Sequence, residues 1–154
     1  MQGERSGPSP SLPIKVVVDS NVIVAAYFNP GSAAADVWQR ARNGDLVLLW
    51  SAATRDEVLS VLEDVKVDPA FRSEVREAFR PEHRVVPQRL AVIEEDPPDN
   101  DLLACAVYGG AHAVITSDRH LLDLRAYHQV RLVTAGDFLN LYRPVHAAQG
   151  SSEG

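Results

Sequence analysis

Short uninterrupted apolar runs alternate with segments of helical periodicity along most of this chain. The runs are IKVVV (14–18), LVLLW (46–50), AVIT (113–116) and VRLVT (130–134). Between them, apolar residues recur at helical spacing. Short continuous strands separated by helices are typical of a parallel sheet that is covered on both faces. The sequence therefore predicts an α/β fold.

The predicted helices follow from the same pattern and from turn residues. We expect them at 21–28, 33–42, 51–65, 69–79, 99–110, 118–124 and 135–142. The stretch 83–93 fits neither periodicity clearly. The first 13 residues are polar and rich in Pro, Gly and Ser, which is typical of a flexible leader, and residues 144–154 resemble a disordered tail. One folded domain is thus expected at 14–143.

Composition narrows the class of protein. The 154 residues are 45% apolar, which is enough for a sizeable core, and the net charge of −6 argues against a broad basic face for nucleic acid. A nuclease whose acids bind metal ions is still compatible with that charge. Cys105 is the single cysteine, so an intramolecular disulfide is excluded and a reducing cytoplasm is expected. Neither a signal peptide nor a membrane-spanning run is visible.

Two acidic residues directly follow predicted strands. Asp19 comes after strand 14–18, and Asp118 lies two residues past Thr116, which ends strand 113–116. Ligands of open α/β sheets bind at the carboxyl ends of the strands, so this placement indicates a site. Capping of the helices that follow is the simpler structural explanation of both residues.

Two further acids are selected by helical geometry. In the helix 51–65, Glu57 lies at the border of the apolar stripe, whereas Asp56 points away toward water. In the helix 99–110, Asp99 lies on the side of Leu102 and at the helix start, where the aligned peptide dipoles favour an anion. Asp101 would take this place if the helix began later, but the Leu102 spacing favours Asp99.

Four carboxylates near one another would repel and raise one another's pKa. Such a group is understandable if Asp19, Glu57, Asp99 and Asp118 together bind a hard divalent cation. Mg²⁺ prefers oxygen ligands and usually combines a few carboxylates with substrate phosphate. The sequence thus points to metal-assisted hydrolysis of phosphodiesters.

The ordered motifs resemble those of the PIN-domain ribonucleases, and within them the toxins of bacterial type II toxin–antitoxin systems. The motifs are VVVDSNV with Asp19, DEVLSVL with Glu57, PPDNDLLACAVYGG with Asp99 and ITSDRHLL with Asp118. Each is weak alone, but the ordered set is specific and covers about 14–143. The resemblance implies a three-layer α/β/α sandwich with a central parallel sheet and Mg²⁺- or Mn²⁺-dependent cleavage of RNA.

The resemblance also implies roles for individual residues. Asp19, Asp99 and Asp118 would be metal ligands, and Glu57 would complete the catalytic group and help to activate water. Supporting contacts are expected from Ser20, Asn21, Asn100, Thr116 and Ser117, with Asp101 as the alternative to Asp99. Capping explains Ser20 and Asn21 equally well.

Partners follow from the resemblance rather than from the residues. A toxin of this family would cut an RNA substrate and would have a cognate antitoxin protein. It would also form a homodimer, and the outer face of helix 33–42 is one guess for the dimer contact. Arg55, Arg119, His120 and Arg125 are candidate RNA contacts. The alternative is a catalytically silent PIN-like module that binds RNA or protein. A phosphatase is disfavoured because the chain lacks an Asp-x-Asp motif at Asp19 and a glycine loop after it.

Overall fold

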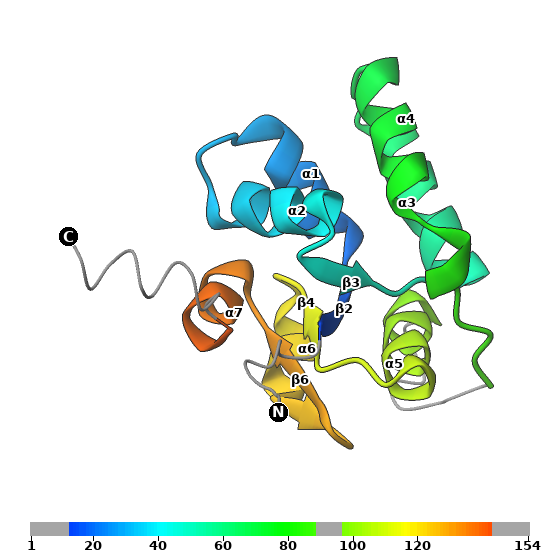
Figure 1. The fold of residues 1–154 in the computed structure, drawn as a ribbon, viewed down its shortest axis with the longest axis vertical. Helices are drawn as coiled ribbons and strands as arrows, with labels where there is room; N and C mark the ends of the chain where they lie inside the picture. Colours follow the sequence, from blue (N-terminus) through cyan, green and yellow to red (C-terminus); the bar gives the residue numbers. More distant parts are fainter. Residues whose placement is uncertain (1–12, 89–96, 143–154) are drawn as a thin grey trace, which may run out of the picture.

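One five-stranded sheet organises the fold. The computed structural model describes residues 13–88 and 97–142 (Figure 1). The strands are β2 (Ile14–Val18), β3 (Leu46–Leu48), β4 (Ala113–Ile115), β5 (Ala126–Tyr127) and β6 (Val130–Val133). Their order is β3-β2-β4-β6-β5. The first four run parallel, with Val16 opposite both Leu48 and Ala113, whereas β5 is antiparallel to β6.

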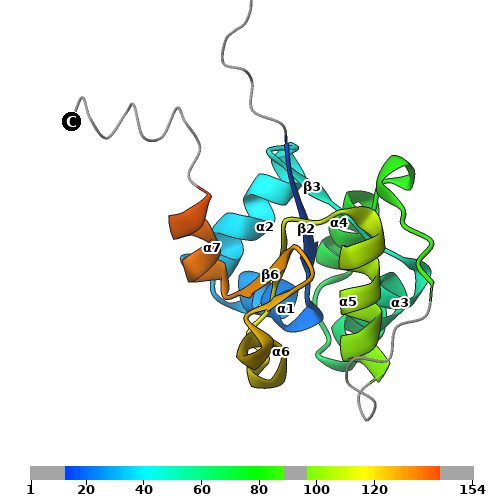
Figure 2. The same cartoon turned by 90° about the horizontal axis from the view of Figure 1, so that it is seen from below.

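Helices cover both faces of this sheet. They are α1 (Ser20–Phe28), α2 (Ala33–Asn43), α3 (Ala52–Asp64), α4 (Pro69–Ala78), the 3₁₀ turn η1 (Pro81–His83), α5 (Pro97–Gly109), α6 (Arg119–Leu124) and α7 (Ala135–Leu141). Figure 2 shows α2 and α7 on one side of the strands and α5 on the other. The chain therefore has the expected three-layer α/β/α architecture.

Alternation along the central strand separates the two halves of the core. Val16 and Val18 of β2 pack into one buried cluster with residues of α1, α2, α4 and α7, whereas Val17 packs into a second cluster with residues of α5 and α6. All three side chains are at most 4% exposed. A strand buried on both faces explains why the sequence shows an uninterrupted valine run rather than an apolar–polar alternation.

Helix α3 is fixed at its start by a capping box. The Ser51 hydroxyl accepts a hydrogen bond from the Thr54 N–H at 3.2 Å, and the Thr54 hydroxyl accepts one from the Ser51 N–H at 2.9 Å. This reciprocal pair satisfies two backbone donors that a helix start leaves open. It defines where α3 begins, and therefore which of its side chains face the sheet edge.

The structure differs from the expected elements in three places. Strand 46–50 is shorter than expected, because Trp50 pairs with Arg84 in an isolated bridge after β3 ends at Leu48. Strand β5 was not expected; it makes the sheet mixed at one edge and is too short to leave a pattern in the sequence. Helix α5 begins at Pro97, two residues earlier than expected.

Some expectations fall outside the described residues. The expected tail and, apart from Pro13, the expected leader lie there, as does the 89–96 part of the ambiguous stretch 83–93. Within 13–88 and 97–142, no helix has both the length and the apolarity needed to cross a bilayer.

Candidate functional site

A cavity of about 260 Å³ opens beside the carboxyl ends of β2 and β4, and all four predicted acids line it. Asp19 comes from the β2–α1 junction, Glu57 from α3, Asp99 from α5 and Asp118 from the β4–α6 junction. Asp101 of α5 lines the same cavity. Folding therefore brings together side chains that are up to 99 residues apart in the sequence.

Asp19 occupies the N-cap position of α1, but its side chain does not cap the helix. Instead the carboxylate, with the residue only 9% exposed, accepts a 2.7 Å hydrogen bond at Oδ2 from the Thr116 hydroxyl. The Asp19 N–H donates to the Ile115 carbonyl at 2.9 Å, which anchors the residue to the neighbouring strand β4. The interpretation of Asp19 as a simple helix cap is therefore wrong.

Thr116 connects Asp19 with Asp118. Its hydroxyl donates to Asp19 and accepts the Asp118 N–H at 2.9 Å, and the side chain is fully buried. Asp118 in turn accepts the His120 N–H at Oδ1 at 2.8 Å and so caps α6. Asp118 therefore serves as a helix cap and lines the cavity at the same time, as the sequence allowed.

Burial is the main cause of the altered acidity of Asp19. Desolvation raises the pKa of this carboxyl above its usual range, because the charged form is poorly solvated there. Hydrogen bonds from Thr116 and Ser20 oppose this shift in pKa, and the negative charge of Asp118 adds to it. A buried carboxylate with a second carboxylate nearby is a position where a cation would be favourable.

Helix α3 presents Glu57 to the cavity from an exposed position. Thr54, one turn earlier, lines the cavity too, whereas the Asp56 side chain is 71% exposed and does not, as the helical-face argument predicted. Sequence reasoning missed Thr54, although its spacing of three from Glu57 was a usable signal. Burial raises the pKa of the Cys105 thiol in α5 to about 12, and the side chains of Ser51 and Thr54 oppose this shift in pKa.

Both acids at the start of α5 reach the cavity. Asp99 is 4% exposed, and Asp101 is half-buried, which raises the pKa of its carboxyl. The early helix start at Pro97 places both in the first turns of α5. The choice of Asp99 over Asp101 as a ligand stays a prediction.

Apart from Thr116, the supporting residues divide into two groups. Ser20 and Asn21 line the cavity, and the Ser20 hydroxyl lies 3.5 Å from Asp19 Oδ1. Asn100 is half-buried and Ser117 is exposed, and neither lines the cavity. The remaining wall consists of Val58, Pro98 and Leu102, which the sequence did not single out as site residues.

A model of the PIN domain matches residues 15–120, which is more than half of the chain and includes all four acids. The chain belongs to the PIN-domain family. PIN domains are generally nucleases and typically use divalent metals. Comparison with curated protein sequences gave no match.

The donor chemistry of this PIN domain fits Mg²⁺ or Mn²⁺, since the charged groups of the cavity are all carboxylates. The spacing of these carboxylates is wider than a metal site requires. Among residues 13–88 and 97–142, no three His, Cys, Asp or Glu side chains lie close enough together to hold one ion. The acids thus share a cavity without forming a closed ligand set.

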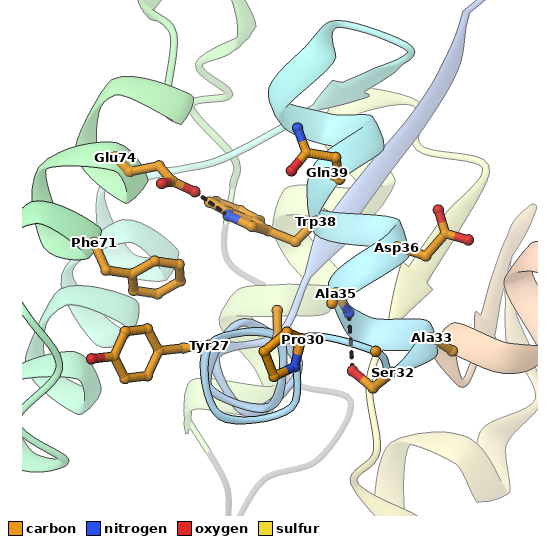
Figure 3. A pocket seen from close by; sticks show the side chains of 12 residues that line it. Tyr27, Pro30, Ser32, Ala33, Ala35, Asp36, Trp38, Gln39, Phe71 and Glu74 are labelled. Carbon is orange, nitrogen blue, oxygen red and sulfur yellow. Dashed lines mark hydrogen bonds between the residues drawn. The ribbon is translucent and has the colours of Figure 1, made fainter.

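A second and larger cavity, of about 630 Å³, lies between α1, α2 and α4 (Figure 3). Tyr27, Trp38 and Phe71 form its aromatic side, and the Trp38 indole donates to Glu74 at 2.9 Å. None of the four predicted acids lines it. This cavity is therefore separate from the acidic one, and it is lined by two carboxylates, Asp36 and Glu74, where the acidic cavity has five.

The predicted RNA contacts lie outside the acidic cavity. Arg119, His120 and Arg125 are exposed on or next to α6, and Arg55 is on α3. None of the four lines the cavity. Their role in binding RNA stays a prediction.

Proposed function

We propose that this PIN domain is a metal-dependent endoribonuclease that hydrolyses RNA phosphodiester bonds. The observation that carries the proposal is the convergence of Asp19, Glu57, Asp99 and Asp118 on one cavity at the carboxyl end of the sheet. Two of these acids are less than a tenth exposed, which is unusual for carboxylates without a function. The family match over the same residues supports a nuclease.

The residues have distinct proposed roles. Asp19, Asp99 and Asp118 hold Mg²⁺ or Mn²⁺, and Asp101 is the alternative ligand to Asp99. When bound, such an ion supplies charge neutralisation at the phosphate and activates water. Thr116 fixes the orientation of the Asp19 carboxylate through its 2.7 Å hydrogen bond. Glu57, exposed at the rim, is free to accept a proton from the attacking water.

We further propose that the protein is the toxin of a bacterial type II toxin–antitoxin system. Its partners would be a cognate antitoxin protein and a second copy of the chain, with the outer face of α2 as the proposed dimer contact. The support is the resemblance of the four motifs to those toxins. Growth arrest on induced expression, absent for an Asp19→Asn variant, is the expected result.

The second candidate function is a catalytically silent module that binds RNA or protein. It is favoured by one observation: within the described part of the chain, no three acidic side chains are close enough to share an ion. The presence of all four acids in one cavity favours the enzyme instead.

RNA cleavage assays distinguish these two functions. Wild-type protein is incubated with single-stranded RNA and Mg²⁺ or Mn²⁺, beside an Asp19→Asn variant and an EDTA control. We expect cleavage only by the wild type with metal. Cleavage that survives both controls would exclude the proposed chemistry, and absence of cleavage by folded wild type would favour the silent module. Equal degradation of DNA would contradict the RNA assignment.

A further inference from the structure

Trp50, two residues before α3 begins, is the centre of a cationic cluster. The guanidinium carbon of Arg55 lies 5.1 Å from the Trp50 ring centroid, and that of Arg84 lies 5.7 Å from it. Both distances are within the range of a cation–π contact, which orients a guanidinium against the ring. Two arginines from different segments are thus aligned on one aromatic side chain.

The backbone fixes this arrangement. The Trp50 indole donates to the Arg80 carbonyl at 2.7 Å, and the Val85 N–H donates to the Trp50 carbonyl at 2.7 Å. Trp50 is 5% exposed and forms a parallel bridge with Arg84. The position of Arg84 relative to the ring is therefore set by main-chain pairing rather than by a free surface loop.

Among residues 13–88 and 97–142, one exposed ion pair involves these two arginines. Arg55 contacts Asp56 at 3.4 Å, a pair whose side chains are 39% and 71% exposed. Exposed pairs of this kind contribute little and exchange readily. Among the described residues, Arg84 has no ion pair. The two guanidinium groups beside one ring thus bring two positive charges together in a chain of net charge −6, and Asp56 is the carboxylate that contacts one of them.

The first turns of α3 connect the cluster with the proposed catalytic cavity. Arg55 directly follows Thr54, which lines that cavity, and Glu57 comes two residues later. The five carboxylates of the cavity repel a polyanion, so RNA needs cationic contacts in order to approach them. Arginine is suited to this task because its planar guanidinium binds phosphate through two donors while it stacks on an aromatic ring.

We propose that Arg55 and Arg84, aligned on Trp50, form a phosphate clamp that binds the backbone of the RNA beside the acidic cavity. The clamp rests on the proposed nuclease function, and it names the residues that hold the substrate. Phosphate contacts position a nucleic acid without reading its sequence. The clamp therefore contributes affinity and register, not base preference.

Binding is tested separately from cleavage. A fluorescein-labelled single-stranded oligoribonucleotide is titrated in EDTA with wild type, Arg55→Gln and Arg84→Gln, and anisotropy is measured at several salt concentrations. We expect the Kd at low salt to rise several-fold in each variant. The slope of log K against log salt should fall by roughly 0.7 for each lost contact. An Arg131→Gln variant, exposed on β6 at the other end of the sheet, is the matched control and should bind like wild type.

Two further variants separate a phosphate contact from a purely structural role. Asp56→Asn removes the carboxylate that competes for Arg55, so RNA binding should become tighter than in wild type. Arg84→Lys keeps the charge but loses the planar group, so the salt slope should stay near the wild-type value while the Kd rises. Far-ultraviolet circular dichroism and the thermal midpoint establish that each variant is folded.

The possible results are distinguishable. Unchanged Kd and salt slope in both folded glutamine variants would overturn the clamp, and so would an equal loss in Arg131→Gln. Equal losses of affinity for RNA and for a DNA oligonucleotide of the same sequence support a phosphate contact. Losses of affinity confined to RNA would mean that the cluster contacts the 2′-hydroxyl, and they would overturn the phosphate clamp. Lack of cleavage with the expected binding losses would remove the nuclease function and leave the clamp intact.

Discussion

Thr116 joins two of the acidic side chains through one hydroxyl group. It donates to Asp19 and accepts from the backbone N–H of Asp118, and it is fully buried. The side chain can satisfy both contacts because a hydroxyl is a donor and an acceptor at once. The orientation of the Asp19 carboxylate therefore depends on a residue that the sequence marked only as supporting.

Replacement of Thr116 by Val removes both hydrogen bonds and preserves the side-chain shape. We expect a loss of about 1–3 kcal/mol in unfolding free energy, because Asp19 and the Asp118 N–H lose a buried partner. RNA cleavage should fall by about 10- to 100-fold. Denaturant unfolding and initial cleavage rates measure the two effects. Thr116→Ser keeps the hydroxyl and should retain most of both; equal activity of the Val and Ser variants would contradict the proposed role.

Asp19 is expected to lower stability when no cation is present. Its folded-state pKa lies above the unfolded value of about 3.9, so the native state binds the proton more tightly. The contribution of protonated Asp19 to the free energy of unfolding is fully present below the pKa of the unfolded state. It is lost as the pH rises through the folded-state pKa, and it is absent at neutral pH. Asp19→Asn should therefore unfold at a higher temperature than wild type in EDTA at pH 7.

The pH dependence of this difference is the measurement. Thermal midpoints of wild type and Asp19→Asn are compared in EDTA from neutral pH down to about pH 4, and the gap should close as the pH falls. Asp56→Asn changes an exposed carboxylate in the same way and should leave the midpoint nearly unchanged. A gap that widens toward acid would show that the sign of the Asp19 shift is wrong.

At the scale of elements, α5 and the bridge after β3 meet without space between them. A Cβ on Gly109, the last residue of α5, would lie 2.7 Å from Val85 Cγ2 and 2.8 Å from Leu49 Cδ1. Both neighbours are buried, so neither can move away without disturbing the core. Close packing here fixes the end of the helix that carries Asp99 and Asp101 at its start.

Gly109→Ala should therefore destabilise the fold. We expect a cost of about 1–3 kcal/mol from overpacking, reduced by the better helix propensity of Ala. Chemical denaturation provides the measurement. Gly31→Ala is the control, because a Cβ there meets no atom within 4 Å and its backbone is not left-handed. Equal stability of the two alanine variants would mean that Val85 and Leu49 can move away from α5 without loss of unfolding free energy.

The element scale also shows the limit of sequence patterns. The valine run of β2 and the helical stripe of α3 are local features, and both were predicted. The antiparallel strand β5 has two residues, and the bridge between Trp50 and Arg84 joins residues 34 apart, so neither produces a local periodicity. Short or isolated pairings form because the surrounding fold places the chains together.

For the whole molecule, metal binding should be linked to stability. A ligand that binds only the folded state raises stability by about 2.7 kcal/mol at 100 times its Kd. Mg²⁺ or Mn²⁺ should therefore raise the thermal midpoint of wild type by several degrees, and Asp19→Asn should lose most of this shift. Differential scanning fluorimetry measures the thermal midpoints, and KCl at matched ionic strength is the control for the added salt. A shift that is equal in both proteins would place the ion elsewhere.

The amino-acid sequence by itself determined the class of fold and the acids at the ends of β2 and β4. These follow from local rules, since apolar runs define strands and parallel strands end at one edge of a sheet. The tertiary structure decided which helix acids reach the cavity, namely Glu57, Asp99 and Asp101. It also decided that the Asp19 carboxylate accepts a hydrogen bond from Thr116 instead of capping α1. The contact of Arg55 and Arg84 with one ring, that of Trp50, is a further tertiary feature. Such contacts depend on how each helix is placed and rotated over the sheet. Packing between segments that are distant in the sequence determines this placement, and the local pattern of apolar residues does not.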